Sequence, residues 1–178
     1  MSYTIDTHNF EVYKLGDSIL ASYPFIVSDV RYTCWFTELT APVESVEQTV
    51  EEIEDEGTFD AGPGTFKVDF DLEERFQSGD EDLLFVIPEG GYRNTITNLR
   101  HITDAIGEII EIHQKAYNCV FYFAEPATRG HDVLYKRNII PMLSKVGYSY
   151  YVVDENAQEG NSYIFLKELS VGVDDDLQ

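Results

Sequence analysis

Apolar residues recur at steps of three and four between Thr95 and Ala116, the longest regular pattern in the chain. Residues at this spacing lie on one side of an α-helix, so the pattern predicts an amphipathic helix over Thr95–Ala116. Gly107 lies inside it and costs about 1 kcal/mol relative to alanine, which points to a close packing contact. The apolar stripe consists of Ile96, Leu99, Ile102, Ile106, Ile109, Ile110 and His113.

Short apolar runs, rich in β-branched or aromatic residues, lie on both sides of this helix and predict buried strands. They are Leu83–Ile87 and Cys119–Phe123. Two strands joined by one crossing helix are usually parallel, with a right-handed connection. We therefore expect these two strands to be parallel neighbours in the sheet.

A second helix is predicted over His131–Val146. Pro141 has no amide proton to donate, so we expect a kink or a break near Arg137–Ile140. Gly147 suits the left-handed conformation that closes a helix. The chain then continues into two strands that we expect to form an antiparallel hairpin. These strands are Tyr148–Val153 and Ser162–Lys167.

The N-terminal half alternates between apolar and polar residues, which is typical of antiparallel strands with one buried face. Pro24 is expected to end the second of these strands. Trp35, the only tryptophan, lies on the same face of its strand as Arg31 and Thr33, and it is either a sheet-face anchor or a ring on a binding surface. The predicted strands are Tyr3–Leu15, Ser18–Tyr23, Val30–Leu39 and Thr65–Leu72.

Together the patterns predict one α/β (α+β) domain over residues 1–178 with a mixed central sheet. Antiparallel N-terminal strands precede a β-α-β-α-β-β half over residues 83–169. Residues 42–82 form an acidic excursion that includes a helix over Pro42–Asp55, and residues 170–178 form an acidic tail. The hydrophobic fraction of 43% is sufficient for a core.

The 178 residues carry a formal net charge of −21, and the acidic residues concentrate between Glu44 and Asp82. This balance argues against direct nucleic-acid binding. We expect the acidic segment to contact a protein partner with a basic surface, and the alternative is a solvated face that maintains solubility. The expected contact residues are Glu44, Glu47, Glu51, Glu52, Glu54, Asp55 and Glu56.

The remaining composition indicates a cytoplasmic protein. The chain has no run of about 18 apolar residues, so we expect no membrane-spanning segment. The N-terminus lacks the basic and apolar regions of a signal peptide. Cys34 and Cys119 do not make a disulfide framework, although a single bridge stays possible.

Few residues have the spacing that catalysis or metal binding requires. The four histidines and two cysteines lack metal-ligand spacing, and no nucleophile elbow or phosphate-binding loop is present. His113 lies on the apolar helix stripe and is expected in the core. The loop after the strand Cys119–Phe123 carries Glu125 and His131, which are the candidate bases if the protein is an enzyme.

The order of elements resembles the Gcn5-related N-acetyltransferase fold. The most specific piece is Met142–Tyr148, where Lys145, Gly147 and Tyr148 are similar to the Lys-x-Gly-aromatic end of that family's late helix. The resemblance covers residues 83–169. It implies acetyl-CoA as cofactor, bound by a basic, glycine-rich loop before the long helix.

The same resemblance implies a degenerate member of the family. If Arg93 takes the basic position, Ile96 and Asn98 replace the two glycines, and Leu143 replaces the tyrosine that acts as general acid. The remaining candidates for cofactor contact are Gly91, Arg93, Asn94 and Thr95. Such a chain is similar to the inactive acetyltransferase-like proteins of tailed phages.

We therefore expect a non-enzymatic, acetyltransferase-like protein without a cofactor, acting through protein contacts in a host cytoplasm or a virion. One alternative is an active acyl-CoA-dependent N-acyltransferase with a remodelled cofactor loop. Another is an acidic inhibitor that mimics DNA and occupies the basic groove of a nucleic-acid-binding host protein.

Overall fold

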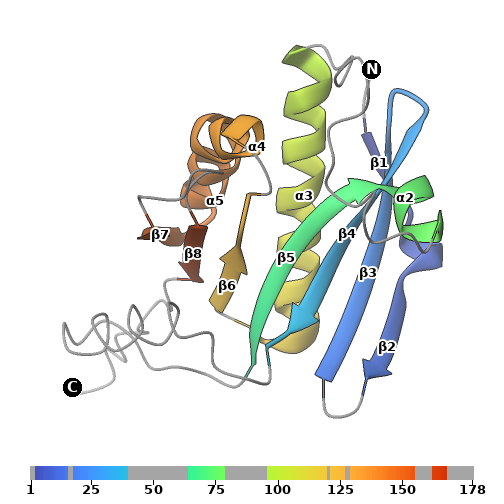
Figure 1. The fold of residues 1–178 in the computed structure, drawn as a ribbon, viewed down its shortest axis with the longest axis horizontal. Helices are drawn as coiled ribbons and strands as arrows, with labels where there is room; N and C mark the ends of the chain where they lie inside the picture. Colours follow the sequence, from blue (N-terminus) through green and yellow to red (C-terminus); the bar gives the residue numbers. More distant parts are fainter. Residues whose placement is uncertain are drawn as a thin grey trace, which may run out of the picture.

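The computed structural model describes residues 3–15, 18–39, 64–78, 96–119, 121–126, 129–154 and 162–167. Within them one mixed sheet of eight strands has the order β1-β3-β4-β5-β6-β8-β7, and β2 also pairs with β3 (Figure 1). The strands are β1 (Tyr3–Ile5), β2 (Glu11–Leu15), β3 (Ser18–Val27), β4 (Val30–Glu38), β5 (Thr65–Leu72), β6 (Phe121–Ala124), β7 (Tyr148–Asp154) and β8 (Ser162–Lys167).

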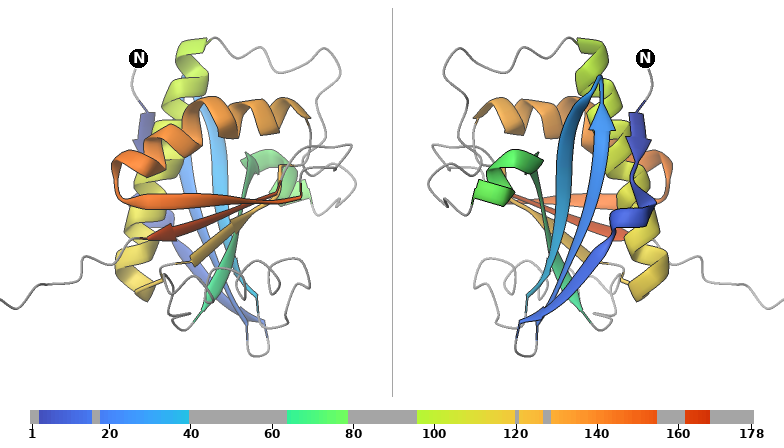
Figure 2. Two further views of the ribbon diagram at one scale, coloured as in Figure 1. Left: turned by 90° about the vertical axis from the view of Figure 1, so that its left-hand side faces the viewer. Right: turned by 90° about the vertical axis from the view of Figure 1, so that its right-hand side faces the viewer.

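Two helical rods cover one face of this sheet, as the two side views in Figure 2 show. One rod is α3, and the other is the continuous run of α4, η3 and α5. The short helix α2 lies against β4. The helical elements are η1 (Thr7–Asn9), α2 (Glu73–Ser78), α3 (Ile96–Tyr117), α4 (Arg129–Leu134), the π-helix η3 (Tyr135–Ile139) and α5 (Ile140–Lys145).

The long helix was predicted to within one residue at each end, and its apolar stripe supplies one side of the core. Ile102, Ile106 and Ile109 are at most 2% exposed. On the sheet, alternate residues of β3, β4 and β5 point toward these side chains. Among them Phe25, Phe36 and Phe66 are at most 1% exposed.

The predicted close contact at Gly107 is also present. A Cβ at this position would collide with the thioether of Met142 on α5. The missing side chain therefore lets α3 and α5 approach each other.

The predicted break in the second helix is a single π-helical turn. Pro141 has no amide proton, so it cannot donate to the carbonyl oxygen four residues earlier. The amide of Ile140 donates instead to the carbonyl oxygen of Tyr135, five residues back, as in a π-helix. Gly147 follows α5 with a φ of +85°, as predicted.

Pro24 does not end a strand, contrary to the prediction, because β3 continues to Val27. The carbonyl oxygen of Pro24 accepts a hydrogen bond of 2.9 Å from the amide of Asp6. Asp6 lies between β1 and β2, where the edge strand departs from β3 into η1. Proline is tolerated because no strand there needs its amide.

The parallel neighbour of β6 was predicted wrongly. β6 pairs in parallel with β5 and antiparallel with β8, so both of its edges are occupied and Leu83–Ile87 is not its neighbour. β5 is antiparallel to β4, as its alternation predicted, and parallel to β6. The run Leu83–Ile87 itself lies outside the described residues.

Other predictions were confirmed or fall beyond the described ranges. The hairpin of β7 and β8 is antiparallel as expected. Cys34 and Cys119 are buried free thiols, so the possible bridge is absent. No helix in the described part of the chain is long and apolar enough to cross a membrane. The acidic helix Pro42–Asp55 and residues 170–178 lie outside the described residues.

Candidate functional site

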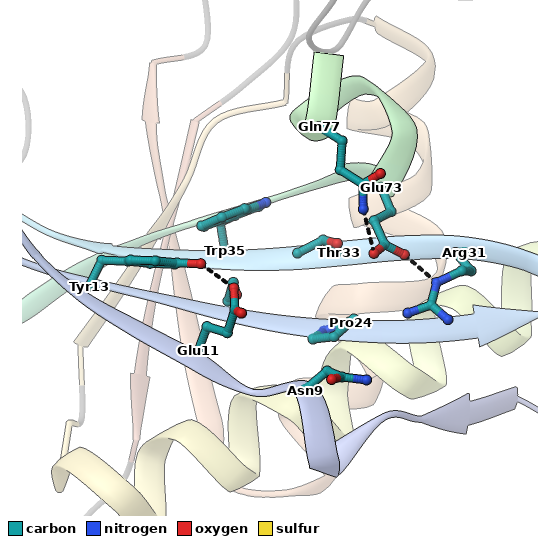
Figure 3. A pocket seen from close by; sticks show the side chains of 10 residues that line it. Asn9, Glu11, Tyr13, Pro24, Arg31, Thr33, Trp35, Glu73 and Gln77 are labelled. Atoms are coloured by element: carbon teal, nitrogen blue, oxygen red, sulfur yellow. Dashed lines mark hydrogen bonds and ion pairs between the residues drawn. The ribbon is translucent and has the colours of Figure 1, made fainter. Parts of the chain in front are cut away.

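A trough of about 450 Å³ lies on the sheet face away from α3, between β2 and α2 (Figure 3). Its position follows from the alternation of β4, in which Tyr32, Cys34 and Phe36 are buried in the core. The residues between them therefore point to the other face. We call this site the β2–α2 trough; it is lined by Asn9, Glu11, Tyr13, Ser22, Pro24, Arg31, Thr33, Trp35, Glu73 and Gln77.

One end of the β2–α2 trough is aromatic. The rings of Tyr13 and Trp35 lie 6.5 Å apart between centroids, with 25° between their planes. The hydroxyl of Tyr13 donates a hydrogen bond to the carboxylate of Glu11, and this bond raises the pKa of Tyr13. Glu11 takes part in no ion pair within the described residues. This end therefore combines two aromatic surfaces with a carboxylate that no described cation pairs with.

The other end is a charged network. The guanidinium of Arg31 donates to the carboxylate of Glu73 and lies 3.5 Å from the carboxylate of Asp6. The side-chain amide of Gln77 donates to Glu73 at 2.9 Å. The positive charge of Arg31 is thus already matched by carboxylates of the protein.

The floor between these ends is buried and consists of Ser22, Pro24 and Thr33. Ser22 and Thr33 are each only 4% exposed, and Pro24 is buried between them. The register explains their placement, because Ser22 lies opposite both Glu11 and Trp35, and Pro24 lies opposite Thr33. Neighbouring strands thereby hold the aromatic end and the floor in a fixed relation.

A second candidate site lies where β5 and β6 separate. The parallel ladder joins only Thr65, Phe66 and Lys67 to β6, and β6 ends at Ala124 while β5 continues to Leu72. Carboxyl ends of parallel strands are the usual ligand sites of open α/β sheets. At this point the ammonium of Lys67 lies 3.3 Å from Glu125 and 3.7 Å from Asp69.

The side chains at this separation differ in burial, and that of Asp69 is the least exposed of the three, at 19%. Burial raises the pKa of Asp69, and the neighbouring ammonium of Lys67 opposes part of that effect. Glu125 is more accessible, since its side chain is 58% exposed. The structure therefore places Glu125 at the end of β6, as expected, but in an ion pair.

Tyr135 of η3 fills the space beyond the end of β6. Its ring lies 6.5 Å from that of Phe70 on β5 and stacks at 5.8 Å on that of Tyr163 on β8. Tyr135 is 5% exposed. The hydroxyl of Tyr163 donates to the carboxylate of Asp132, which also lies 2.9 Å from the ammonium of Lys136. The protein's own side chains occupy the place where β5 and β6 diverge.

The structure places only some of the residues that the sequence singled out. His131 lies in α4, and its side chain is outside the described part of the structure. Leu143, which the resemblance would align with a general acid, is 1% exposed and lies in the core. The cofactor candidates and the acidic contact residues lie outside the described residues: Gly91, Arg93, Asn94, Thr95, Glu44, Glu47, Glu51, Glu52, Glu54, Asp55 and Glu56.

His113 is a core residue, as predicted. It is fully buried, its ring stacks 4.0 Å from that of Phe36, and burial lowers its pKa to about 3. Among the residues that the structure describes, no group of three histidine, cysteine, aspartate or glutamate side chains has the arrangement of a metal site.

The sequence did not identify the β2–α2 trough. Alternation placed Arg31, Thr33 and Trp35 on one face, which was a usable signal. The contributions of Glu11 and Glu73 depend on the pairing register and on the path of α2 after β5. We compared the chain with protein-family models, curated proteins and solved structures, and none of the three comparisons gave a match.

Proposed function

We propose that this chain is a non-enzymatic protein with a degenerate acetyltransferase-like fold, acting through contacts with a basic protein partner. The order of the described elements supports the first part. Antiparallel strands precede β5, and then α3, β6, the second helical rod, β7 and β8 follow in the succession that the resemblance implies. β5 is the parallel neighbour of β6, the position that was expected for Leu83–Ile87.

One observation carries the proposal that the protein is not an enzyme. The carboxyl end of the parallel pair is where a sheet of this kind binds its ligand. Here that place holds Tyr135, packed between β5 and β8 and 5% exposed, with the hydrogen bond from Tyr163 to Asp132 beside it. A cofactor would have to displace a buried ring and break a buried hydrogen bond of a charged group, which is costly.

The experiment is calorimetric titration of the full chain with acetyl-CoA. We expect no saturable heat at micromolar concentrations. A dissociation constant of a few micromolar, weakened by Arg93→Ala, would refute the proposal and favour the alternative of an active N-acyltransferase. The matched control is Arg137→Ala, an exposed arginine on η3, which removes the same charge at a residue that is not among the expected cofactor contacts.

The second part of the proposal, a basic protein partner, is supported by the net charge of −21. Association steered by such a charge weakens as salt rises. The test replaces Glu47, Glu51, Glu52 and Glu54 together by glutamine and measures capture of partners at low and high salt. If the variant retained all partners, the acidic segment would not be the surface that binds them. The setting we propose is a host cytoplasm or a phage virion, as the resemblance implies.

A further inference from the structure

We infer that the β2–α2 trough binds a lysine or arginine side chain from an extended segment of a protein partner. This inference takes the kind of partner from the proposed function and assigns a described site to it. Three properties of the trough lead to it: its length, its excess of carboxylates over cations among the described residues, and its aromatic end.

The length of the β2–α2 trough fits a short extended segment. Arg31 and Trp35 mark its two ends and lie four residues apart on β4, which corresponds to about 13 Å at the rise of a strand. Its volume of about 450 Å³ is sufficient for a long side chain and the backbone around it. The floor of Ser22, Pro24 and Thr33 is buried and already shaped, so little of it has to be ordered on binding.

The charge of the β2–α2 trough selects a cation. Arg31 and Glu73 neutralise each other at one end, and Asp6 adds a further carboxylate beside Arg31. At the other end Glu11 carries a negative charge without an ion pair among the described residues. The formal net charge of −21 disfavours an anionic ligand in addition.

The aromatic end gives the cation a specific place. Lysine and arginine bind over the faces of tryptophan and tyrosine within about 6 Å of the ring centre, and tryptophan is the strongest partner. Trp35 and Tyr13 lie next to the Glu11 carboxylate, as Figure 3 shows. A guanidinium or ammonium group there would meet an aromatic face and a carboxylate at once. A neutral ligand could still donate a hydrogen bond to the carboxylate, but it would lack both the charge pairing and the cation–π attraction.

The test uses the emission of Trp35, which reports on this site alone because it is the only tryptophan. The full chain is titrated with the capped peptide acetyl-Gly-Ser-Arg-Ser-Gly-amide. The matched ligand replaces arginine by citrulline, which has the same shape without the charge. We expect a saturable change of emission with the arginine peptide, and affinity at least about tenfold weaker with citrulline.

Two variants separate the trough from general attraction of charge. Glu11→Gln is expected to weaken the arginine peptide by about tenfold, whereas Glu74→Gln is expected to change its affinity by less than about twofold. Glu74 is an exposed carboxylate beside Glu73 that does not line the trough. Far-ultraviolet circular dichroism establishes that both variants fold, and Glu11→Ala, which also removes the charge, is the second variant if Glu11→Gln does not.

Three results would overturn the inference. Equal affinity for the arginine and citrulline peptides would mean a site for neutral ligands, such as a saccharide. If Glu11→Gln and Glu74→Gln lost equal affinity for the arginine peptide, the peptide would be attracted by net charge only. No saturable response below about 10 mM would mean that the trough is not a cation site. None of these results involves acetyl-CoA, so they would leave the proposed non-enzymatic role standing.

Discussion

The imidazole Nδ1 of His113 lies 2.9 Å from the hydroxyl oxygen of Tyr122, and neither residue has any exposed surface. The other ring nitrogen, Nε2, has no hydrogen-bond partner among the described residues. A protonated imidazole carries two N–H donors, and here the one on Nε2 would be buried without an acceptor among the described residues. The fold therefore holds His113 neutral.

This arrangement predicts a loss of stability in acid. Burial lowers the pKa of His113 in the folded protein to about 3 from an ordinary value of 6.5. Below pH 6.5 the unfolded chain takes up the proton first, so the free energy of unfolding falls as the pH drops from 6.5 toward 3. One proton accounts for a slope of at most about 1.4 kcal/mol per pH unit.

The measurement is urea unfolding at a series of pH values for the wild type and His113→Phe. The difference between the two free energies should change across this window and stay constant above it. His8→Gln, at an exposed histidine, is the control and should follow the wild type. A constant difference between wild type and His113→Phe from pH 7 to pH 4 would show that His113 is not held neutral.

The contact between α3 and α5 predicts that the effect of Gly107→Ala on stability changes sign when Met142 is also replaced. Gly107→Ala should destabilise the protein, because the new methyl group collides with Met142. In a Met142→Ala background the collision is gone, and the same substitution should stabilise α3 by about 1 kcal/mol through helix propensity. Thermal unfolding of the wild type, the two single mutants and the double mutant gives the coupling free energy between the two positions. We expect it to be at least about 1 kcal/mol. Additive effects would rule out the close approach.

Asp132 contacts both Tyr163 and Lys136, and we expect the removal of these two partners to lower stability by unequal amounts. Tyr163→Phe keeps the ring beside Tyr135 but removes the donor to Asp132, and we expect a loss of about 1.5–3 kcal/mol. Lys136 also pairs with Asp132, yet its side chain is 48% exposed, so Lys136→Gln should cost less than about 1 kcal/mol. Urea denaturation compares the two, and the reverse order would contradict this account of the site.

The two thiols should react only when the protein unfolds. Burial raises the pKa of Cys119 to about 11 and that of Cys34 well above its ordinary value, and both side chains are fully buried. A thiol reagent such as 5,5′-dithiobis(2-nitrobenzoate) at about pH 8 should therefore modify neither in the folded protein, since the thiolate is the reactive form. Both should react within minutes in denaturant. Fast modification under native conditions would be inconsistent with this burial.

The prediction of α3 succeeded and the prediction of the parallel partner of β6 failed for the same physical reason. Helical spacing shows which side of a segment is buried, and in α3 that information was almost sufficient, including the contact at Gly107. In β5 the alternation correctly placed Phe66 and Val68 toward the core. Alternation carries no information about which strand lies at each edge. The apolar run Leu83–Ile87 therefore seemed the better parallel partner for β6.

The same limit explains the candidate sites. The sequence placed Arg31 and Trp35 on one face of β4, but the partners that make a trough come from β2 and α2. Bringing Glu11 opposite Ser22, and Ser22 opposite Trp35, requires the register of three strands. Similarly, the resemblance drew attention to Leu143. The packing of Tyr135 against Phe70 and Tyr163 depends instead on the π-helical turn, of which the sequence indicated only a break before Pro141.

The interruption of the sheet edge at Pro24 also bears on association between copies of the protein. An exposed strand edge can pair with the edge of another molecule and begin aggregation, and short or broken edge strands resist this. Here β1 has three residues and β2 has five, and η1 separates them. A neighbouring molecule would therefore meet two short edge strands instead of one long edge strand. By letting the edge strand leave β3, Pro24 helps to keep a sheet of eight strands from growing into a larger one.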